Sequence, residues 1–573
     1  MKKKLRIHFI GMSQDHHSRL KTISLAPFAL KAYVDRYLGK EFPNVIETQA
    51  SDFFWDTSPE EIVSSIDIKD VDLLCFSIYT WNVAELIETS KIFKRKKKNV
   101  IIALGGPEVA PVAQKVMEEN PHVDLIPFTP LDGELIVYNI AKALIEERGL
   151  NTVPGIVFRS ADNSLVKTEP LPEHLDLATV PSPYVTGDIK FEEGKDYIAT
   201  VETSRGCPYD CGYCFWGKMQ GVSFFPLERV YKDIETIYNN ERVKEVHFTD
   251  SDFFMNRKRS QAILEFILKQ NPNVITYFEI NARTITEDLA RLAGSLKNFQ
   301  FILSPQTSNS RSLELISRKR DTMDIFLEKV KLIRRVAPDA HITTAIILGL
   351  PEDTLADFKK TLDFCMSLEP KKLNVGYPLY LLPGSRFYEE RDKMGLRYTP
   401  KPIYAVLETP TFPQKDMNEA AILICWVQLF ICYFPAVRDF LYLAARQDKR
   451  RYVEIIERWK DAIDSKLHLL PKDIDITDTV SASVKKWNEV KRDFFLKGSE
   501  TEGAYTIYRT IYDLEKDRHA KDMVKTIALG VKVFDYLMSK NIDSFSSIPF
   551  EGIASKIGPD SRDIRYVFST FKK

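Results

Sequence analysis

The chain has 573 residues, 44% of them hydrophobic and 28% charged, which is the balance of an ordinary globular protein. This length is too great for a single core and indicates three or four domains. Lys and Arg together number 80, as do Asp and Glu, so the charge gives no sign of general nucleic-acid binding. Seven cysteines in so long a chain are typical of a reduced, cytoplasmic protein.

Residues 1–150 alternate between short apolar runs and helical stretches. The N-terminal run is too short for a signal peptide and predicts a first strand. Near-continuous apolar strands that alternate with helices predict an α/β domain with a doubly wound parallel sheet, Rossmann- or flavodoxin-like. Ligands of such sheets bind beyond the carboxyl ends of the strands. The predicted strands are 5–12, 44–48, 71–79, 99–106 and 123–128.

Residues 151–195 are rich in proline and turn residues, and we expect a linker with a small hairpin. A second alternating region, residues 196–410, predicts a partial (β/α)6 barrel of the TIM type, whose chemistry lies at the C-terminal strand ends. Its predicted strands are 197–204, 243–250, 274–282, 299–305, 341–349 and 373–382.

Residues 411–573 predict a helical domain. The segment 420–437 is almost wholly apolar but just short of the usual spanning length of about 20 residues. We interpret it as a core helix, or one that lies near a hydrophobic substrate, and we expect no membrane span.

Three cysteines, Cys207, Cys211 and Cys214, stand within eight residues after the first barrel strand. An odd number argues against a disulfide set, and no second cysteine pair is present to complete a structural zinc site. A cluster with three thiolate ligands, by contrast, leaves one iron open. The spacing therefore favours an iron–sulfur cluster.

The stretch "SRGCPYDCGYCFW" resembles the signature of the radical S-adenosylmethionine (SAM) enzymes. This resemblance implies that Cys207, Cys211 and Cys214 hold a catalytic 4Fe–4S cluster and that SAM binds the fourth iron. It also implies that Tyr213 lies against the adenine.

Later segments are similar to further motifs of the same family. "FTDSDFFMN" resembles the second-strand segment that contacts SAM, "FEINAR" the acid and arginine that hold its ribose and carboxylate, and "SPQTSNSRSLELISRKR" the fourth-strand motif. The SAM-binding residues that the resemblance implies are Asp250, Asp252, Glu279, Arg283, Gln306, Ser308 and Arg318.

The segments "FSIYTWN" and "ALGGPEVA" resemble the cobalamin-binding domain that precedes the barrel in one radical SAM subclass, and "PLDGEL" is a looser match. The implied cobalamin contacts are Ser77, Tyr79, Trp81, Gly105, Gly106, Pro107, Glu108 and Gly133. Many such domains ligate cobalt through Asp-x-His-x-x-Gly. Here Asp15, His16 and His17 are followed by Leu20 where that motif has glycine, so we expect no histidine ligand.

The resemblance implies a cobalamin-dependent radical SAM methyltransferase acting on an unactivated carbon, or phosphorus, of a small-molecule or peptide substrate through methylcobalamin and a 5′-deoxyadenosyl radical. Two alternatives stay open: a cyclase or rearrangement enzyme with the same cofactors but no methyl transfer, and a non-catalytic cobalamin or cluster sensor. The resemblance further implies an external electron donor such as flavodoxin or ferredoxin. We expect a cytoplasmic monomer that binds no nucleic acid.

Overall fold

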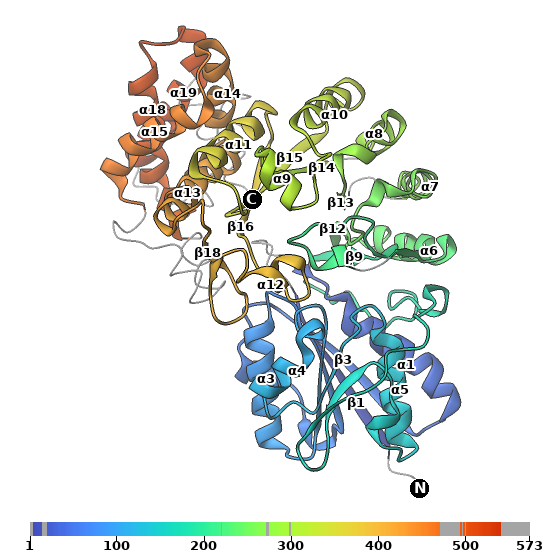
Figure 1. The fold of residues 1–573 in the computed structure, drawn as a ribbon. Helices are drawn as coiled ribbons and strands as arrows, with labels where there is room; N and C mark the ends of the chain where they lie inside the picture. The colour runs from blue at the N-terminus through green and yellow to red at the C-terminus, as the bar shows by residue number, and fades with distance from the viewer. Residues whose placement is uncertain are drawn as a thin grey trace.

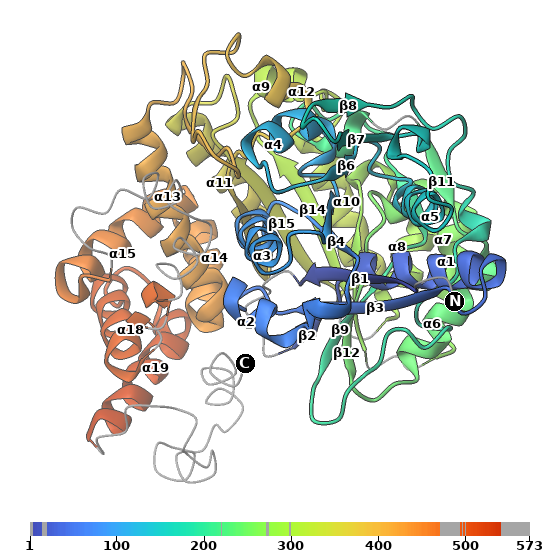
Figure 2. The ribbon, with the colours of Figure 1, turned by 90° about the horizontal axis from the view of Figure 1, so that it is seen from below.

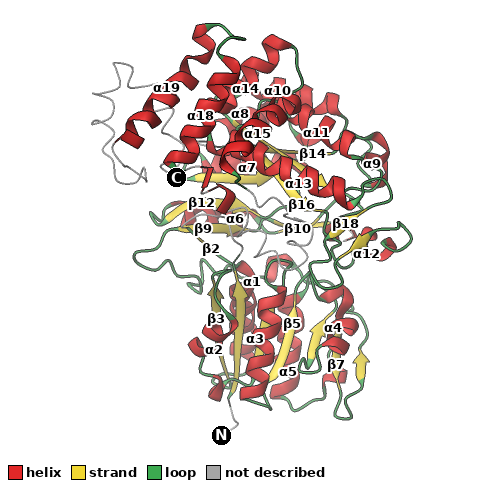
Figure 3. Ribbon diagram, turned by 90° about the vertical axis from the view of Figure 1, so that its left-hand side faces the viewer, coloured by secondary structure: helices red, strands yellow, loops and turns green. Residues whose placement is uncertain are grey.

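The computed structural model describes residues 4–13, 20–218, 221–270, 274–296, 299–469, 493–495, 497–498 and 500–539. An N-terminal α/β unit is followed by a second, larger α/β unit and by a group of C-terminal helices (Figure 1). The two β-sheets lie one beyond the other, with the short strand β10 (Ser204–Gly206) and helix α12 (Arg386–Glu390) between them (Figure 3).

The first sheet has the order β3-β1-β4-β5-β6-β7-β8. Its first five strands are parallel: β1 (Leu5–Met12), β3 (Ile46–Phe53), β4 (Leu73–Ser77), β5 (Ile101–Gly105) and β6 (Leu125–Pro127). An antiparallel hairpin, β7 (Ile156–Arg159) and β8 (Leu165–Lys167), extends the sheet. This hairpin falls in the stretch expected to be a linker, and it belongs to the first sheet.

Helices cover both faces of this sheet. Side chains of α1 (Leu25–Glu41) and α5 (Gly133–Ile145) form one buried cluster with the strands. Side chains of α2 (Pro59–Ser65), α3 (Val83–Lys96) and α4 (Ala113–Glu119) form another on the opposite face. The predicted doubly wound fold is therefore confirmed. Because β1 lies between β3 and β4, the strand order reverses at β1, and ligands of such sheets bind at this switch point.

The second sheet has the order β16-β15-β14-β13-β12-β9-β2, with parallel pairing throughout. The six predicted strands are present as β9 (Tyr197–Val201), β12 (Val243–Phe248), β13 (Ile275–Glu279), β14 (Gln300–Gln306), β15 (His341–Leu348) and β16 (Lys372–Pro378). A two-residue strand that the sequence did not reveal, β2 (Lys21–Thr22), pairs with β9. The prediction of a partial barrel is confirmed.

The outer helices of this open barrel are α6 (Leu227–Tyr238), α7 (Arg257–Ile267), α8 (Glu287–Gly294), α10 (Met323–Val336) and α11 (Leu355–Ser367). A short helix, α9 (Ser310–Leu315), follows β14. The chain then makes a small hairpin, β17 (Arg397–Tyr398) and β18 (Val406–Glu408), before the C-terminal helices.

The C-terminal region is helical in its described residues, as predicted. It contains α13 (Gln414–Gln428), the π-helical turn η8 (Leu429–Tyr433), α14 (Pro435–Asp448), α15 (Tyr452–Leu467), α18 (Thr501–Glu515) and α19 (Lys521–Ser539). These helices share a large buried cluster with α11, β15 and β16 and gather on one side of the molecule (Figure 2).

The helix Gln414–Tyr433 is long and apolar enough to cross a membrane by length and composition, but 61% of its most apolar window is buried inside the fold. Trp426 and Phe430 are wholly buried. The polar side chain of Gln428 donates a hydrogen bond of 3.3 Å to the backbone carbonyl of Leu373 in β16. The surroundings are those of a core helix.

Candidate functional site

The three clustered cysteines lie on a loop whose base is closed by a miniature sheet. Strand β10 pairs antiparallel with β11 (Val222–Phe224), and the cysteines lie between the two. Gly206 has a φ of +96°, and a Cβ there would lie 2.3 Å from the backbone oxygen of Gly221. Only glycine permits this approach, so Gly206 fixes the base of the loop.

The far side of the cysteine loop is held by the segments after the fourth and sixth barrel strands. The amide of Gly212 donates to the carbonyl of Ile316 at 3.3 Å, and the Gly212 carbonyl accepts from the amide of Phe387 at 2.9 Å. A Cβ at Gly212 would lie 2.8 Å from the Phe387 ring. Helix α12 therefore packs directly on the loop.

The three thiols fit the donor set of an iron–sulfur cluster. All are half-buried, and none is in a disulfide in this described part of the chain. Burial raises the pKa of Cys211, but the Arg318 guanidinium opposes that effect and favours the thiolate. Among the described residues no three His, Cys, Asp or Glu side chains stand close enough to hold a metal ion. The loop therefore carries three free thiols, the donors that a cluster needs. To bind one cluster together, the three cysteine side chains have to move closer to one another.

Two predicted arginines meet beside the cysteine loop. Arg283, just after β13, donates from Nε to Asp321 Oδ1 at 2.7 Å, and Arg318 donates from Nε to Asp321 Oδ2 at 2.6 Å. Arg318 also donates from Nη1 to the hydroxyl of Tyr213 at 3.1 Å. Burial raises the pKa of Tyr213, so this hydroxyl stays protonated. Arg283, Arg318 and Tyr213 therefore form one connected group with Asp321.

Asp252 lies near this group and holds two of its segments together through hydrogen bonds. Its carboxylate accepts from the Tyr209 hydroxyl at 2.6 Å, from the Thr284 hydroxyl at 3.0 Å and from the Asn281 amide at 3.2 Å. Burial raises its pKa against these hydrogen bonds. In this structure Asp252 ties the cysteine loop to the segment that carries Arg283.

Asp250 also accepts hydrogen bonds from other side chains of the protein. Its carboxylate accepts from the Thr203 hydroxyl at 2.6 Å and from the Ser204 hydroxyl at 2.5 Å. Burial raises the pKa of Asp250 to about 6. Both hydroxyls lie between β9 and the cysteines, so Asp250 positions the start of the loop.

The other predicted SAM contacts lie at the same strand ends without joining this group. Glu279 ends β13 with an exposed side chain, and the protein around its carboxyl raises its pKa. Gln306 ends β14 with a φ of +66°, a strained conformation of the kind that clusters at binding sites. Ser308 shares a hydrogen bond of 3.0 Å with the Thr361 hydroxyl on α11.

The predicted cobalamin residues of β4 lie at the switch point of the first sheet. Ser77 is buried, and its carbonyl accepts from the side-chain amide of Asn82 at 3.2 Å. The rings of Tyr79 and Trp81 stack with centroids 4.5 Å apart and planes 9° apart. Trp81 donates from its indole to the carbonyl of Met12, which ends β1, at 3.3 Å. An aromatic platform therefore spans the ends of β1 and β4.

Gly105, the last residue of β5, and Gly106, which follows it, lie beside the end of β4 that leads to this platform. A Cβ at Gly106 would lie 2.3 Å from the Ile78 carbonyl oxygen, whereas one at Gly105 would meet only the Phe76 carbonyl oxygen at 3.9 Å. Gly106 is therefore required by the neighbouring loop itself. Pro107 follows half-buried.

Glu108 has an unusual environment at the end of the same loop. One carboxylate oxygen accepts from the Thr80 hydroxyl at 2.8 Å, and the other is buried with no hydrogen-bond partner in the described chain. Burial raises the pKa of Glu108 to about 7. An orphaned buried polar atom beside an aromatic platform suits a ligand with hydrogen-bonding groups on its rim, as the amide-fringed corrin of cobalamin has.

Gly133 begins α5 next to the buried Asp132, whose carboxylate accepts from the Leu175 amide at 2.8 Å. The histidines His16 and His17, with Asp15, lie outside the described residues.

A bridge joins the two sets of loops. Arg205, two residues before Cys207, donates to Glu134 of α5 at 2.7 and 3.0 Å and to Glu202 at 2.8 and 3.0 Å. It also donates to the carbonyl of Leu131 at 3.0 Å. Arg205 keeps 12% of its side-chain surface exposed and Glu134 keeps 5%. Burial raises the pKa of Tyr79 to about 12, and the charges of Glu202, Arg205 and Glu134 also act on this hydroxyl.

Sequence reasoning did not select Arg205, Glu134, Asp321 or Tyr209. Each stands inside or next to a segment that it did select: Arg205 and Tyr209 in the cysteine motif, Glu134 in "PLDGEL" and Asp321 three residues after Arg318. Each has a partner that is distant in sequence: Arg205 and Glu134 are 71 positions apart, Tyr209 and Asp252 are 43 apart, and Asp321 and Arg283 are 38 apart, so only the fold reveals their roles.

Comparisons with known proteins agree with this arrangement. Residues 26–132 match the B12 binding domain model, and residues 201–365 match the Radical SAM superfamily model. Among curated proteins the chain is 28% identical over 379 residues to the cobalamin-dependent radical SAM methyltransferase TokK of Streptomyces tokunonensis, covering 61% of this chain and 53% of that protein. The chain thus spans about half the length of this relative.

A second relative is the hopanoid C-3 methylase of Methylococcus capsulatus, 24% identical over 332 residues that cover 56% of this chain and 60% of that protein. The fold is similar to that of OxsB, a cobalamin-dependent S-adenosylmethionine radical enzyme solved with aqua-cobalamin and S-adenosylmethionine bound (TM-score 0.60, 13% identity, 93% of this chain and 84% of that one). It is also similar to TsrM of Kitasatospora setae, solved with cobalamin and a [4Fe-4S] cluster (TM-score 0.54, 15% identity, 70% and 78%). The chain thus combines a region that matches the B12 binding domain model with one that matches the Radical SAM superfamily model, in a fold similar to that of two cobalamin-dependent radical SAM enzymes.

Proposed function

We propose that the protein is a cobalamin-dependent radical SAM methyltransferase that methylates an unactivated carbon, or phosphorus, of a small-molecule or peptide substrate. The observation that carries this proposal is the meeting of the two sets of strand-end loops at Arg205. Its hydrogen bonds to Glu134 and to the Leu131 carbonyl hold the cysteine loop against the loops of the first sheet. Two cofactors bound there would face one substrate.

When bound, the cluster with SAM supplies a 5′-deoxyadenosyl radical and cobalamin supplies the methyl group. Cys207, Cys211 and Cys214 would hold the cluster. Arg318 faces the cysteine loop and its guanidinium favours the thiolate form of Cys211. With Arg283 and Asp321 it forms the polar group in which SAM would be oriented, and Tyr213 would lie against the adenine.

The residues of the first sheet would place the second cofactor. Tyr79 and Trp81 offer a flat apolar surface at the switch point, and Glu108 offers a buried hydrogen-bonding group beside it. Because the Glu108 pKa is raised to about 7, this carboxyl can donate a proton in a hydrogen bond near neutral pH. Packing of α12 on the cysteine loop would help to exclude water from between the domains.

The alternatives use parts of the same arrangement. A cyclase or rearrangement enzyme would need both cofactors, and a sensor would need no group for orienting SAM. The Arg283–Asp321–Arg318 group beside the cysteine loop favours turnover over sensing. We further propose that an external donor such as flavodoxin or ferredoxin supplies the electron, and that the protein acts as a cytoplasmic monomer.

The proposal is tested by anaerobic reconstitution with iron, sulfide and cobalamin, followed by SAM and dithionite. We expect 5′-deoxyadenosine from the wild-type protein and none from Cys211→Ala. A protein that binds both cofactors and yet never cleaves SAM, with or without candidate substrates, would be a sensor.

A further inference from the structure

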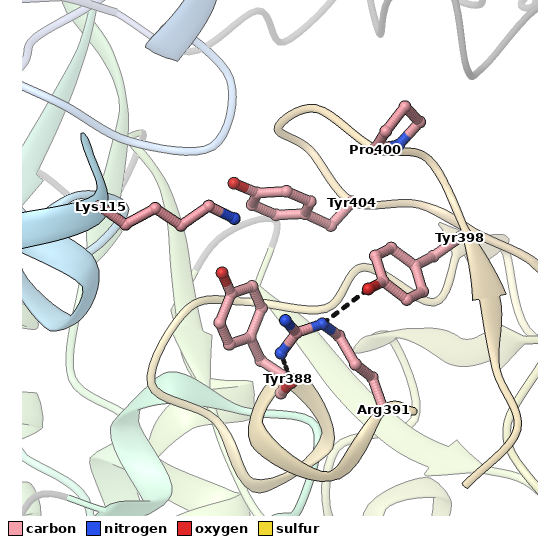
Figure 4. A pocket seen from close by; sticks show the side chains of 6 residues that line it. All are labelled: Lys115, Tyr388, Arg391, Tyr398, Pro400 and Tyr404. Atoms are coloured by element: carbon pink, nitrogen blue, oxygen red, sulfur yellow. Dashed lines mark hydrogen bonds between the residues drawn. The ribbon is translucent and has the colours of Figure 1, made fainter. Parts of the chain in front are cut away.

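A pocket of about 310 Å³ opens where the two α/β domains meet, outside every segment selected from the sequence. Its lining residues are Lys115, Tyr388, Arg391, Tyr398, Pro400 and Tyr404 (Figure 4). Lys115 lies on α4 of the B12 binding domain, and the other five residues follow the last barrel strand. The pocket is therefore shared between domains.

Two cations enter this pocket without a carboxylate in its lining. The ammonium of Lys115 lies 5.2 Å from the centre of the Tyr404 ring. The guanidinium of Arg391 lies 4.3 Å from the centre of the Tyr388 ring and donates from Nε to the Tyr398 hydroxyl at 2.9 Å. Within the described chain, neither Lys115 nor Arg391 makes a salt bridge. Two positive charges thus face the same space, and the Asp392 carboxylate, which accepts a hydrogen bond of 3.3 Å from the Tyr398 hydroxyl, offsets the charge of Arg391 only from outside the lining.

The tyrosines hold these cations in place and add hydrogen-bond donors. The hydroxyls of Tyr388 and Tyr404 both lie toward the Lys115 amino group (Figure 4). Burial raises the pKa of Tyr404, so its hydroxyl stays neutral. A site with two cations, neutral hydroxyl donors and aromatic walls is suited to a carboxylate or phosphate attached to an apolar body.

The pocket borders both proposed cofactor regions. Tyr388 lies on α12, the helix whose Phe387 amide binds the Gly212 carbonyl of the cysteine loop. Nearby, a Cβ at Gly384 would lie 2.9 Å from Pro111, which comes three residues after Glu108. Glu108 is close enough to Tyr404 to affect its titration. A molecule anchored here would extend toward the space between the two sets of strand-end loops.

We propose that this pocket anchors an anionic group, a carboxylate or phosphate, of the small-molecule substrate. The proposal rests on the function proposed above and narrows its substrate class. Each cation contributes a charge-assisted hydrogen bond, and loss of one such bond weakens binding about tenfold or more.

The test is calorimetric titration of the anaerobic holoprotein at low salt with phenyl phosphate and with benzoate, against the neutral phenol and benzamide. We expect the wild-type protein to bind at least one anion at least tenfold more tightly than its neutral counterpart. Lys115→Met and Arg391→Gln should each remove most of that preference, and Lys115→Arg should retain part of it. Lys232→Met, on the exposed face of α6, is the matched control and should behave as the wild type.

Equal binding of anions and neutral compounds by the wild type, or an undiminished preference in both variants, would overturn the proposal. Cobalamin carries a phosphodiester of its own, which cobinamide lacks. If Lys115→Met weakens binding of cobalamin but not of cobinamide, the pocket holds the cofactor's phosphate and the substrate assignment is wrong. Because iron, sulfide and cobalamin are measured on every sample, failure to load the cofactors is a separate result that counts against the proposed function alone.

Discussion

The guanidinium of Arg205 binds the carboxylate of Glu134 through two hydrogen bonds, of 2.7 and 3.0 Å, although the two residues are 71 positions apart. Arg205 leads into the cysteine loop, and Glu134 lies in the first turn of α5, the last helix of the first α/β unit. Burial works against the charge on Glu134, but Arg205 prevails and lowers the pKa of that carboxyl. The pair joins the domains and stays ionised.

Arg205→Met should destabilise the protein strongly, because it leaves Glu134 and Glu202 without their cation in a buried place. Breaking a buried pair in this way costs about 3–5 kcal/mol. Calorimetric unfolding should show a clear fall in midpoint for Arg205→Met. Lys319→Met, which removes the exposed Lys319–Glu314 pair, should leave the midpoint nearly unchanged. Equal changes of the unfolding midpoint in the two variants would mean that the Arg205–Glu134 pair does not stabilise the fold.

Replacement of any one of Cys207, Cys211 and Cys214 by alanine should abolish the cluster, since three thiolates suit a 4Fe–4S site. We expect about four irons and four sulfides per reconstituted wild-type chain. Cys425→Ala is the matched control, because Cys425 is wholly buried among the C-terminal helices. Loss of iron in that variant as well would show that the ligand assignment is wrong.

Gly106→Val should weaken cobalamin binding, for a reason that the sequence did not disclose. The new Cβ would meet the Ile78 carbonyl, and the φ of +113° strains any side chain, so the loop that carries Tyr79 and Trp81 must shift. Gly39→Ala, in helix α1, is the control, since nothing lies within 4 Å of an added Cβ there. Spectrophotometric titration with hydroxocobalamin should separate the two variants. Equal affinities of the two variants for hydroxocobalamin would show that Gly106 does not shape the cobalamin site.

The raised pKa of Glu108 predicts how the stability of the folded protein changes with pH. Its folded pKa of about 7 lies above the ordinary glutamate value of 4.5, so the folded state binds more protons between these values. Stability therefore falls as pH rises from about 4.5 to about 7, by up to about 3 kcal/mol from this group. Urea unfolding of the cobalamin-free protein at pH 5 and pH 8 should show a smaller loss of stability in Glu108→Gln than in the wild type. The same loss in both would mean that Glu108 titrates normally.

The sequence predicts the strands of both sheets because their signals are local. Runs such as 5–12 and 341–349 are apolar over a whole strand, and alternation with helices then determines the fold class. Strand β2 is different: two residues carry no periodicity, and its place beside β9 depends on the path of the chain from β1. A hairpin within 151–195 was expected, but its membership in the first sheet depends on pairing with β6, which no local pattern encodes.

The candidate site likewise contains residues that the sequence reveals and residues that only the structure reveals. The cysteines can be found from their spacing, and the glycine loops stand in short segments that resemble known motifs. The partners that hold them cannot be found in this way, because Asp321 binds Arg283 from 38 positions away and Glu134 binds Arg205 from 71 positions away. Asp250 and Asp252 show the limit most clearly. Their positions mark them as polar groups near SAM, and the structure reveals how many internal hydrogen bonds they already accept.

The most direct test of the central claim is to incubate the anaerobic holoprotein with SAM carrying a deuterated methyl group and a reductant, and to analyse the cobalamin and the nucleosides by mass spectrometry. A methyltransferase predicts that the deuterated methyl group appears on cobalamin together with S-adenosylhomocysteine, and that 5′-deoxyadenosine forms as well. Formation of 5′-deoxyadenosine while the cobalamin remains unlabelled would contradict methyl transfer and favour the cyclase or rearrangement enzyme.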